Sequence, residues 1–273
     1  MTYSEICEKL RGAGVENPEW DTALLVEHFC GVDASLVPLC TDRDYESDGL
    51  RDAVLRRCAR YPLQYLLGEW QFYRQTYEVS PHCLIPRSDT EVLVEEAIRL
   101  LPNGARFADL CTGSGCIAVS VLAERSDTRA VAVEKFPDTL ALAERNAQKN
   151  GVRTRFAPIR ADVLAGDCLA DAGLFDAILS NPPYITEQEM ETLAPELRAE
   201  PRAALDGGGD GLIFYRHIVA NYAHRLTEHG FFLFEIGCEQ AEAVQRIGRA
   251  SGFANTRVIR DLGGNDRVVF LQK

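Results

Sequence analysis

The run Ser180-Asn181-Pro182-Pro183-Tyr184 combines groups that could bind an NH2 group on a planar molecule. The two prolines fix the backbone and leave the carbonyl groups of Pro182 and Pro183 free of strand pairing. The Asn181 side-chain oxygen and the Pro182 carbonyl could together accept both hydrogens of one NH2 group, while Tyr184 offers a flat face. A simple Pro-Pro turn capped by Asn is the structural alternative.

This arrangement suits methyl transfer to an amide or amino nitrogen. An amide nitrogen is a poor nucleophile because its lone pair is delocalised into the carbonyl. Two acceptors on its N–H groups would raise its electron density and align it with the methyl donor. The proton can leave after transfer, so no general base is required. We predict that Asn181, Pro182, Pro183 and Tyr184 are the catalytic residues and also contact the substrate.

A glycine-containing run lies where a predicted strand meets a helix. Gly113 and Gly115 remove side chains where backbone could approach a ligand, and Glu134 follows roughly 20 residues on, where an acid can bind ribose hydroxyls. This spacing fits NAD or S-adenosylmethionine, but the dinucleotide fingerprint would need glycine at Ala118. A glycine turn needed only for strand–helix packing is the alternative.

We predict that the cofactor is S-adenosyl-L-methionine, with S-adenosyl-L-homocysteine as product and no metal. After the third strand, Asp162 could accept a hydrogen bond from the adenine amino group and Val163 could pack on the ring; a solvated loop aspartate is equally compatible. The predicted cofactor-binding residues are Asp109, Cys111, Thr112, Gly113, Ser114, Gly115, Glu134, Asp162, Val163 and Asn181.

Strands and helices alternate from about residue 87, which predicts a parallel, doubly wound sheet. The last two strands are joined by a loop too short for a crossover helix, so they should be antiparallel. The expected fold is α/β, a class I (Rossmann-like) methyltransferase sheet with an antiparallel terminal hairpin. Strands are expected at 106–110, 130–134, 155–159, 175–180, 231–236, 256–259 and 267–271, and helices at 91–101, 117–125 and 138–150.

The chain before this sheet is predicted to be helical. Thr2 and Glu5 have capping-box spacing, and Asn17-Pro18 suits a helix start. Apolar residues at 50, 53, 54, 58 and 61 share one helical face. Aromatic and β-branched residues around the polar pair Arg74-Gln75 predict a β-hairpin. We therefore expect a helical domain at 1–68, a hairpin linker at 69–86 and a methyltransferase domain at 87–273.

Composition narrows the class of protein. The 273 residues carry a net charge of −12, the reverse of the basic footprint of a duplex-binding enzyme. No apolar run approaches the roughly 20 residues that span a bilayer, and the first residues do not resemble a signal peptide. The nine cysteines are scattered and the five histidines lack ligand spacing. We expect a cytoplasmic enzyme with no metal site, no membrane contact and no direct duplex DNA binding.

Several segments together resemble the HemK/PrmC family of peptide chain release factor glutamine methyltransferases. Besides the Asn-Pro-Pro-Tyr loop they are Arg60–Gly68, Leu84–Glu91, Glu200–Leu212, Glu235-Ile236-Gly237 with Gln240, and Asp261-Leu262 with Arg267. The resemblance implies methylation of the glutamine side-chain amide in the Gly-Gly-Gln loop of a bacterial release factor. It also implies that the helical domain docks this factor, and that Leu84 and Arg87 lie with residues 181–184 at the substrate mouth.

The chain departs from the family pattern at three positions. Cys111 stands where the family usually has glycine, so we expect that turn to shift or to need no positive φ. Glu134 replaces aspartate and should still bind ribose, and Ser88 replaces a proline.

Other functions stay open at this point. Glutamine methylation of a ribosomal protein is the nearest alternative, and DNA adenine amino-methylation could use the same loop on a flipped base. A binding protein with this fold but no turnover is the non-enzyme alternative. An oxidoreductase acting on porphyrinogen is disfavoured because no flavin or redox motif is present.

Overall fold

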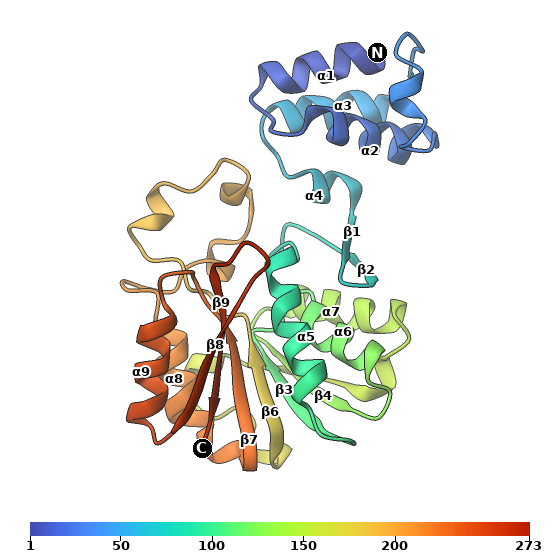
Figure 1. Ribbon diagram of the computed structural model, residues 1–273. Coiled ribbons are helices and arrows are strands. Elements are labelled where there is room, and N and C mark those ends of the chain that lie inside the picture. The colour runs from blue at the N-terminus through green and yellow to red at the C-terminus, as the bar shows by residue number, and fades with distance from the viewer. The chain divides into compact units, whose positions relative to one another are not determined.

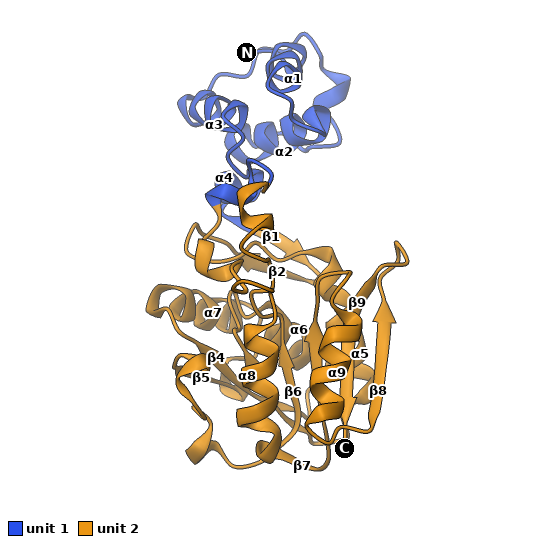
Figure 2. Ribbon diagram, turned by 90° about the vertical axis from the view of Figure 1, so that its left-hand side faces the viewer, with its two compact units in different colours: residues 1–69, 194–199 blue, residues 70–193, 200–273 orange.

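A computed structural model describes residues 1–273, and the chain forms two units (Figure 2). Unit 1 contains Met1–Glu69 together with Ala194–Ala199, and unit 2 contains Trp70–Leu193 and Glu200–Lys273. Residues 194–199, which were expected in the methyltransferase domain, belong to the helical unit.

Unit 1 is built from four helices, α1 (Tyr3–Gly12), α2 (Pro18–Cys30), α3 (Asp48–Cys58) and α4 (Leu63–Leu67). The capping box at α1 is confirmed, because the Thr2 side chain accepts from Glu5 N and the Glu5 side chain accepts from Thr2 N. Pro18 is the first residue of α2, but the Asn17 side chain makes no capping hydrogen bond. The predicted apolar face of α3 is buried at Leu50, Ala53 and Val54.

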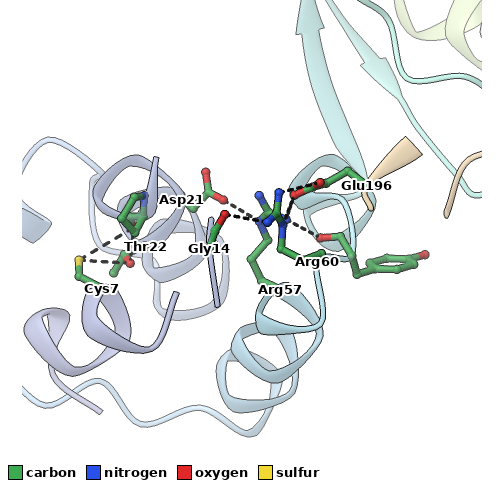
Figure 3. A network of polar contacts seen from close by, with 9 residues as sticks. Cys7, Gly14, Asp21, Thr22, Arg57, Arg60 and Glu196 are labelled. Carbon is green, nitrogen blue, oxygen red and sulfur yellow. Dashed lines mark hydrogen bonds and ion pairs between the residues drawn. The ribbon is translucent and has the colours of Figure 1, made fainter. Parts of the chain in front are cut away.

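Residues 194–199 are held in unit 1 by a cluster of charges (Figure 3). Glu196 accepts from Arg60 Nε at 2.6 Å and from Arg57 Nη1 at 3.1 Å. Arg57 is 9% exposed and donates through Nε to Asp21 at 2.7 Å. Since buried charges are stable only when paired, this cluster, which we call the Glu196 clamp, fixes a distant segment of chain to the helices.

A two-stranded β-hairpin, β1 (Glu69–Phe72) and β2 (Gln75–Glu78), follows the helices. The hairpin was predicted correctly, but its turn was placed one residue too late. The turn consists of Tyr73 and Arg74, and Tyr73 has a positive φ of 56°. Phe72 and Tyr77 are buried in the core of unit 2, so the hairpin is part of that unit's core.

The sheet of unit 2 has seven strands in the order β5-β4-β3-β6-β7-β9-β8 (Figure 1). The five strands from β5 to β7 are parallel, and β9 is antiparallel to both β7 and β8. The predicted antiparallel terminal pair is confirmed, although the sequence did not predict that the last strand lies between the two before it. The strands are β3 (Arg106–Leu110), β4 (Arg129–Glu134), β5 (Phe156–Arg160), β6 (Phe175–Ser180), β7 (Leu226–Glu235), β8 (Asn255–Arg260) and β9 (Asp266–Gln272).

Helices cover both faces of this sheet (Figure 1). Alternate strand residues point to opposite faces, so Phe107 belongs to one apolar core and Ala108 to the other. The first core contains α5 (Glu91–Leu100), α6 (Cys116–Glu124) and α7 (Pro137–Lys149), and the second contains α8 (Ile213–Tyr222) and α9 (Ala241–Ala250). None of the helices is both long and apolar enough to cross a bilayer.

Candidate active site

The strand registers bring three loops together at the carboxyl edge of the sheet. Leu110, the last residue of β3, pairs with Val133 on one side and with Ser180 on the other. Ser180 in turn pairs with Phe234 of β7. The glycine loop, Glu134, Asn181 and Glu235 therefore leave the sheet beside one another, at the place where doubly wound folds bind ligands.

A cleft of about 1020 Å³, its open mouth included, lies at this edge. It is lined by most of the predicted site residues: Leu84, Arg87, Cys111, Thr112, Gly113, Ser114, Glu134, Asp162, Val163, Asn181 and Pro183. Asp109, Gly115, Pro182 and Tyr184 were also predicted, but they are not among the lining residues. Residues that the sequence analysis missed complete the wall, including Cys83, Thr90, Lys135, Phe136, Leu164 and Phe214.

The glycine loop keeps a left-handed backbone at three positions. Cys111, Gly113 and Gly115 have φ values of 60°, 57° and 80°. Two outcomes were expected for cysteine at position 111, a shifted turn or a turn that needs no positive φ, and the second is wrong. The loop therefore carries the strain of a side chain in the left-handed region. A Cβ on Gly115 would lie 3.2 Å from Ala143 Cβ, which shows that this glycine serves packing against α7.

Asp109 lies beneath this loop and is fully buried. Its Oδ2 accepts from Thr112 Oγ1 at 2.5 Å and from Ala118 N at 3.3 Å, while Oδ1 has no partner. Burial raises the pKa of Asp109 to about 7. The carboxyl therefore supports the loop from below.

Glu134 is placed to hold a ligand with hydroxyl groups. Its carboxylate accepts from the backbone N–H groups of Gly113, Lys135 and Phe136. These bonds fix its position in the cleft wall and occupy only three of its roughly four acceptor sites. Burial raises the pKa of Glu134, and the three N–H donors oppose that shift.

Another part of the cleft wall is apolar with one ion pair. Val163 is buried, Phe136 is 42% exposed, and both line the cleft. Asp162 accepts from Leu164 N at 2.9 Å and pairs with Lys135 Nζ at 2.9 Å, and the hydrogen bond from Lys135 lowers the pKa of Asp162. An apolar wall with a fixed carboxylate suits a flat heteroaromatic ring.

The reaction loop is held by hydrogen bonds on both sides. Asn181 Nδ2 donates to Thr90 Oγ1 at 3.2 Å, which leaves Asn181 Oδ1 as the acceptor for a ligand. The Tyr184 hydroxyl donates to Glu235 Oε1 at 3.4 Å. Gln240 Nε2 donates to the Tyr184 carbonyl at 3.0 Å.

A glycine-rich segment packs directly on this loop. A Cβ on Gly207 would lie 2.7 Å from Tyr184 Cα, and one on Gly211 would lie 2.3 Å from the Tyr184 carbonyl oxygen. Only glycine allows this close approach, which explains Gly207 and Gly211 within the segment Glu200–Leu212.

Arg87 is paired within the chain. It forms an ion pair with Glu200, whose other oxygen accepts from Ile85 N at 2.9 Å. Glu200 is 6% exposed, and burial raises its pKa. This pair fixes Arg87, which lines the cleft together with Leu84, the other predicted substrate residue of this segment.

Three thiols also border the cleft. Burial raises the pKa of the Cys83 and Cys111 thiols well above the ordinary value and that of Cys116 to about 12. They are therefore protonated at neutral pH and act as small apolar groups. No group of three or more His, Cys, Asp or Glu side chains in the structure is arranged to hold a metal ion.

Comparison with known proteins gives two family models and many relatives. The PrmC N-terminal domain matches residues 3–68 and the methyltransferase small domain matches residues 88–235. A release factor glutamine methyltransferase of Geobacter sulfurreducens is 41% identical over 262 residues, covering 94% of this chain and 90% of that protein. One of Caulobacter vibrioides is 35% identical, covering 96% and 92%. The chain belongs to the release factor glutamine methyltransferase family. It is therefore a methyltransferase.

A solved structure of a methyltransferase from Pyrococcus furiosus supports the fold. It is 15% identical to this member of the family, with a TM-score of 0.53, and the match covers 72% of this chain and 88% of that one. At this identity the likeness concerns the fold alone.

Three residues of the site had only weak signals in the sequence. Thr90 and Glu200 stand in segments noted for their resemblance to the family, but neither has a pattern that predicts a contact with Asn181 or Arg87. Glu235 stands in the segment Glu235-Ile236-Gly237, which was also noted for its resemblance to the family, and it ends a strand at the carboxyl edge, as Glu134 does.

Proposed function

We propose that this enzyme transfers a methyl group from S-adenosyl-L-methionine to the side-chain amide nitrogen of the glutamine in the Gly-Gly-Gln loop of a bacterial release factor. The observation that carries the proposal is the pairing of Leu110 with Ser180, because it sets the glycine loop and Asn181 at one cleft. Translation termination takes place in the cytoplasm, where we expect the enzyme to act.

The residues of the cleft fit S-adenosylmethionine. The Glu134 carboxylate can accept from ribose hydroxyls, Val163 and Phe136 offer apolar contacts to an adenine, and residues 111–114 of the glycine loop border the same space. When bound, the cofactor would supply an electrophilic methyl group on a positively charged sulfur.

The reaction loop would prepare the amide nitrogen. Asn181 Oδ1 and the Pro182 carbonyl would accept the two N–H groups of the substrate amide, hold the nitrogen in line and increase its electron density. The cleft needs no nucleophilic side chain for this step. Release of the proton to water after transfer completes the reaction.

A labelled-methyl transfer assay tests the proposal. Purified enzyme should label intact release factor and should not label the same factor with its loop glutamine changed to alanine. A ribosomal protein and double-stranded DNA serve as the competing substrates. Faster labelling of either one than of the release factor would show that the proposed substrate is wrong. Labelling of the alanine variant would show that a residue other than the loop glutamine is methylated.

A further inference from the structure

Thr90 occupies the centre of a buried hydrogen-bond arrangement behind the reaction loop. It is 2% exposed, and its Oγ1 accepts from Asn181 Nδ2 at 3.2 Å. A hydroxyl that accepts one hydrogen bond still has its own hydrogen to donate. The acceptor for that hydrogen determines how firmly the Asn181 amide is oriented.

Glu235 has a carboxylate oxygen that could be this acceptor. Its carboxyl is 1% exposed, Oε1 accepts from Tyr184, and Oε2 is buried with no well-aligned partner. The Thr90 hydroxyl is near enough to lower the pKa of Glu235, against burial, which raises that pKa to about 7. The Thr90 hydroxyl therefore has a hydrogen to donate, and Glu235 Oε2 is a buried oxygen that needs a donor.

We infer that Thr90 is a positioning residue that donates to Glu235, accepts from Asn181 Nδ2, and thereby fixes Asn181 Oδ1 toward the substrate NH2 group. The inference rests on the proposed function for the identity of that NH2 group. If the Asn181 amide were rotated by 180°, Asn181 Nδ2 would face the substrate NH2 group. Two N–H donors would then be opposed, and the substrate would lose Oδ1 as its acceptor.

The charge on Glu235 decides the direction of this chain of hydrogen bonds. An ionised Glu235 can only accept, so the Thr90 hydroxyl must point toward it. A protonated Glu235 can donate to Thr90 instead, and the Thr90 hydrogen is then free to turn toward Asn181, where only Oδ1 could accept it. The orienting effect on Asn181 is therefore weakened below the pKa of Glu235.

Other charged and titratable groups surround Glu235. Those that face it are Asp89, Arg267, Tyr184, Tyr215 and Cys116. Arg267 pairs with Asp89 at 3.2 Å and with Asp261 at 3.1 Å, so it forms a fixed positive charge near the carboxyl.

Methyl transfer to release factor across pH is the first test. In the unaltered enzyme the single-turnover rate should rise as pH increases through about 7, because Glu235 becomes ionised. Thr90→Val keeps the shape and removes the hydroxyl, so the rate should fall about tenfold to a hundredfold and lose this rise. Thr90→Ser should restore both. Thr128→Val, which removes a buried hydroxyl bonded to the Arg125 carbonyl far from the cleft, is the matched control and should keep the normal rate.

A second readout does not depend on activity. In enzyme labelled with carboxyl-13C glutamate, the Glu235 resonance, identified by its loss in Glu235→Gln, should titrate in the unaltered protein. Its midpoint should move upward in Thr90→Val, since a donor to the ionised carboxylate is removed, and should return in Thr90→Ser. Thr90→Ala replaces Thr90→Val if the latter folds poorly.

The outcomes separate the two proposals. An enzyme that labels no release factor would contradict the proposed function, while the titration of Glu235 would still test the role of Thr90. A normal transfer rate in Thr90→Val, or an unchanged Glu235 midpoint in that variant, would overturn the positioning role.

Discussion

The Ser180 hydroxyl donates a 2.6 Å hydrogen bond to the carbonyl oxygen of Leu110, across the two central parallel strands. Both residues are fully buried and are the last of their strands, so this bond joins the point where the cofactor loop begins to the point where the reaction loop begins. The distance between the two loops is thereby set by the sheet itself.

Removing this bond should loosen the site. Ser180→Ala should lower the free energy of unfolding by about 1–3 kcal/mol, because the Leu110 carbonyl loses a buried partner, and should also slow methyl transfer. Ser120→Ala removes a comparable buried bond, to the Tyr77 hydroxyl, and should lower stability without slowing transfer. Urea unfolding and single-turnover transfer together decide this, and equal effects of the two variants on transfer would contradict it.

Asn181 is expected to act on the rate of transfer and not on cofactor binding. Asn181→Ala removes an acceptor for the substrate N–H, a loss of roughly 1–3 kcal/mol, or about tenfold to a hundredfold in rate. The affinity for S-adenosylhomocysteine, measured by calorimetry, should change much less. Asn221→Ala on α8, where the amide bonds only to the His217 carbonyl, is the control. A normal transfer rate in Asn181→Ala would refute the proposed mechanism.

Cys111 provides a test of backbone strain. Its φ of 60° is unfavourable for any residue with a Cβ, so Cys111→Gly should be more stable than Cys111→Ala by about 1 kcal/mol. Both variants lose the thiol, and the comparison therefore isolates the backbone. Thermal and urea unfolding measure the difference, and an alanine variant as stable as the glycine variant would show that the turn relaxes.

Stability should depend on pH through Asp109. Burial raises its pKa to about 7 in the folded state, far above the roughly 4 of an unfolded aspartate. The folded protein therefore binds this proton more tightly than the unfolded chain. The contribution of Asp109 to the free energy of unfolding is fully present below about pH 4 and is lost as pH rises through about 7. Asp109→Asn should reduce the decline in unfolding free energy between pH 5 and pH 8, on the order of 1–4 kcal/mol. If the unfolding free energy changed with pH in the same way in the unaltered protein and in Asp109→Asn, Asp109 would not be the cause of the pH dependence.

The Glu196 clamp should govern the order of residues 194–199. Glu196→Gln leaves Arg57 and Arg60 without their shared carboxylate, and a partly exposed pair of this kind is worth about 1–2 kcal/mol. Amide hydrogen exchange in 194–199 and in α3 should accelerate, and proteases should cut this segment faster. Glu8→Gln, an exposed substitution on α1, should change neither. Unaltered exchange in Glu196→Gln would show that backbone packing alone holds the segment.

Much of the sheet could be predicted because its signals are local. Apolar runs such as Phe175–Ser180 and the change from strand to helix after Leu110 depend on neighbouring residues only. The insertion of β9 between β7 and β8 could not be predicted, because a hairpin loop fixes which two strands pair but leaves open which of them pairs with a third.

The residues of the site also fall into those that the local sequence predicts and those that it does not. Glycines and prolines identify the two loops because they alter the backbone where they stand. Thr90 and Glu200 act through side chains that meet residues 91 and 113 positions away, and no local pattern records such a meeting. Asp109 stands one residue before the end of β3, and its buried carboxyl lies beneath the loop. Its assignment to the cofactor stays a prediction.

The Glu196 clamp has a consequence for the order of events during synthesis. Arg60 leaves the ribosome long before its partner, since 136 residues separate the two in sequence. At roughly 5–20 residues per second the helices would wait about 7 to 27 seconds for Glu196 to emerge. By then β3 to β6 have been made. The N-terminal unit therefore begins first but becomes complete only after most of the sheet has left the ribosome. In a nascent chain stalled before residue 196, Arg57 would already have Asp21 as its partner, whereas the carboxylate that pairs with Arg60 would not yet have been translated.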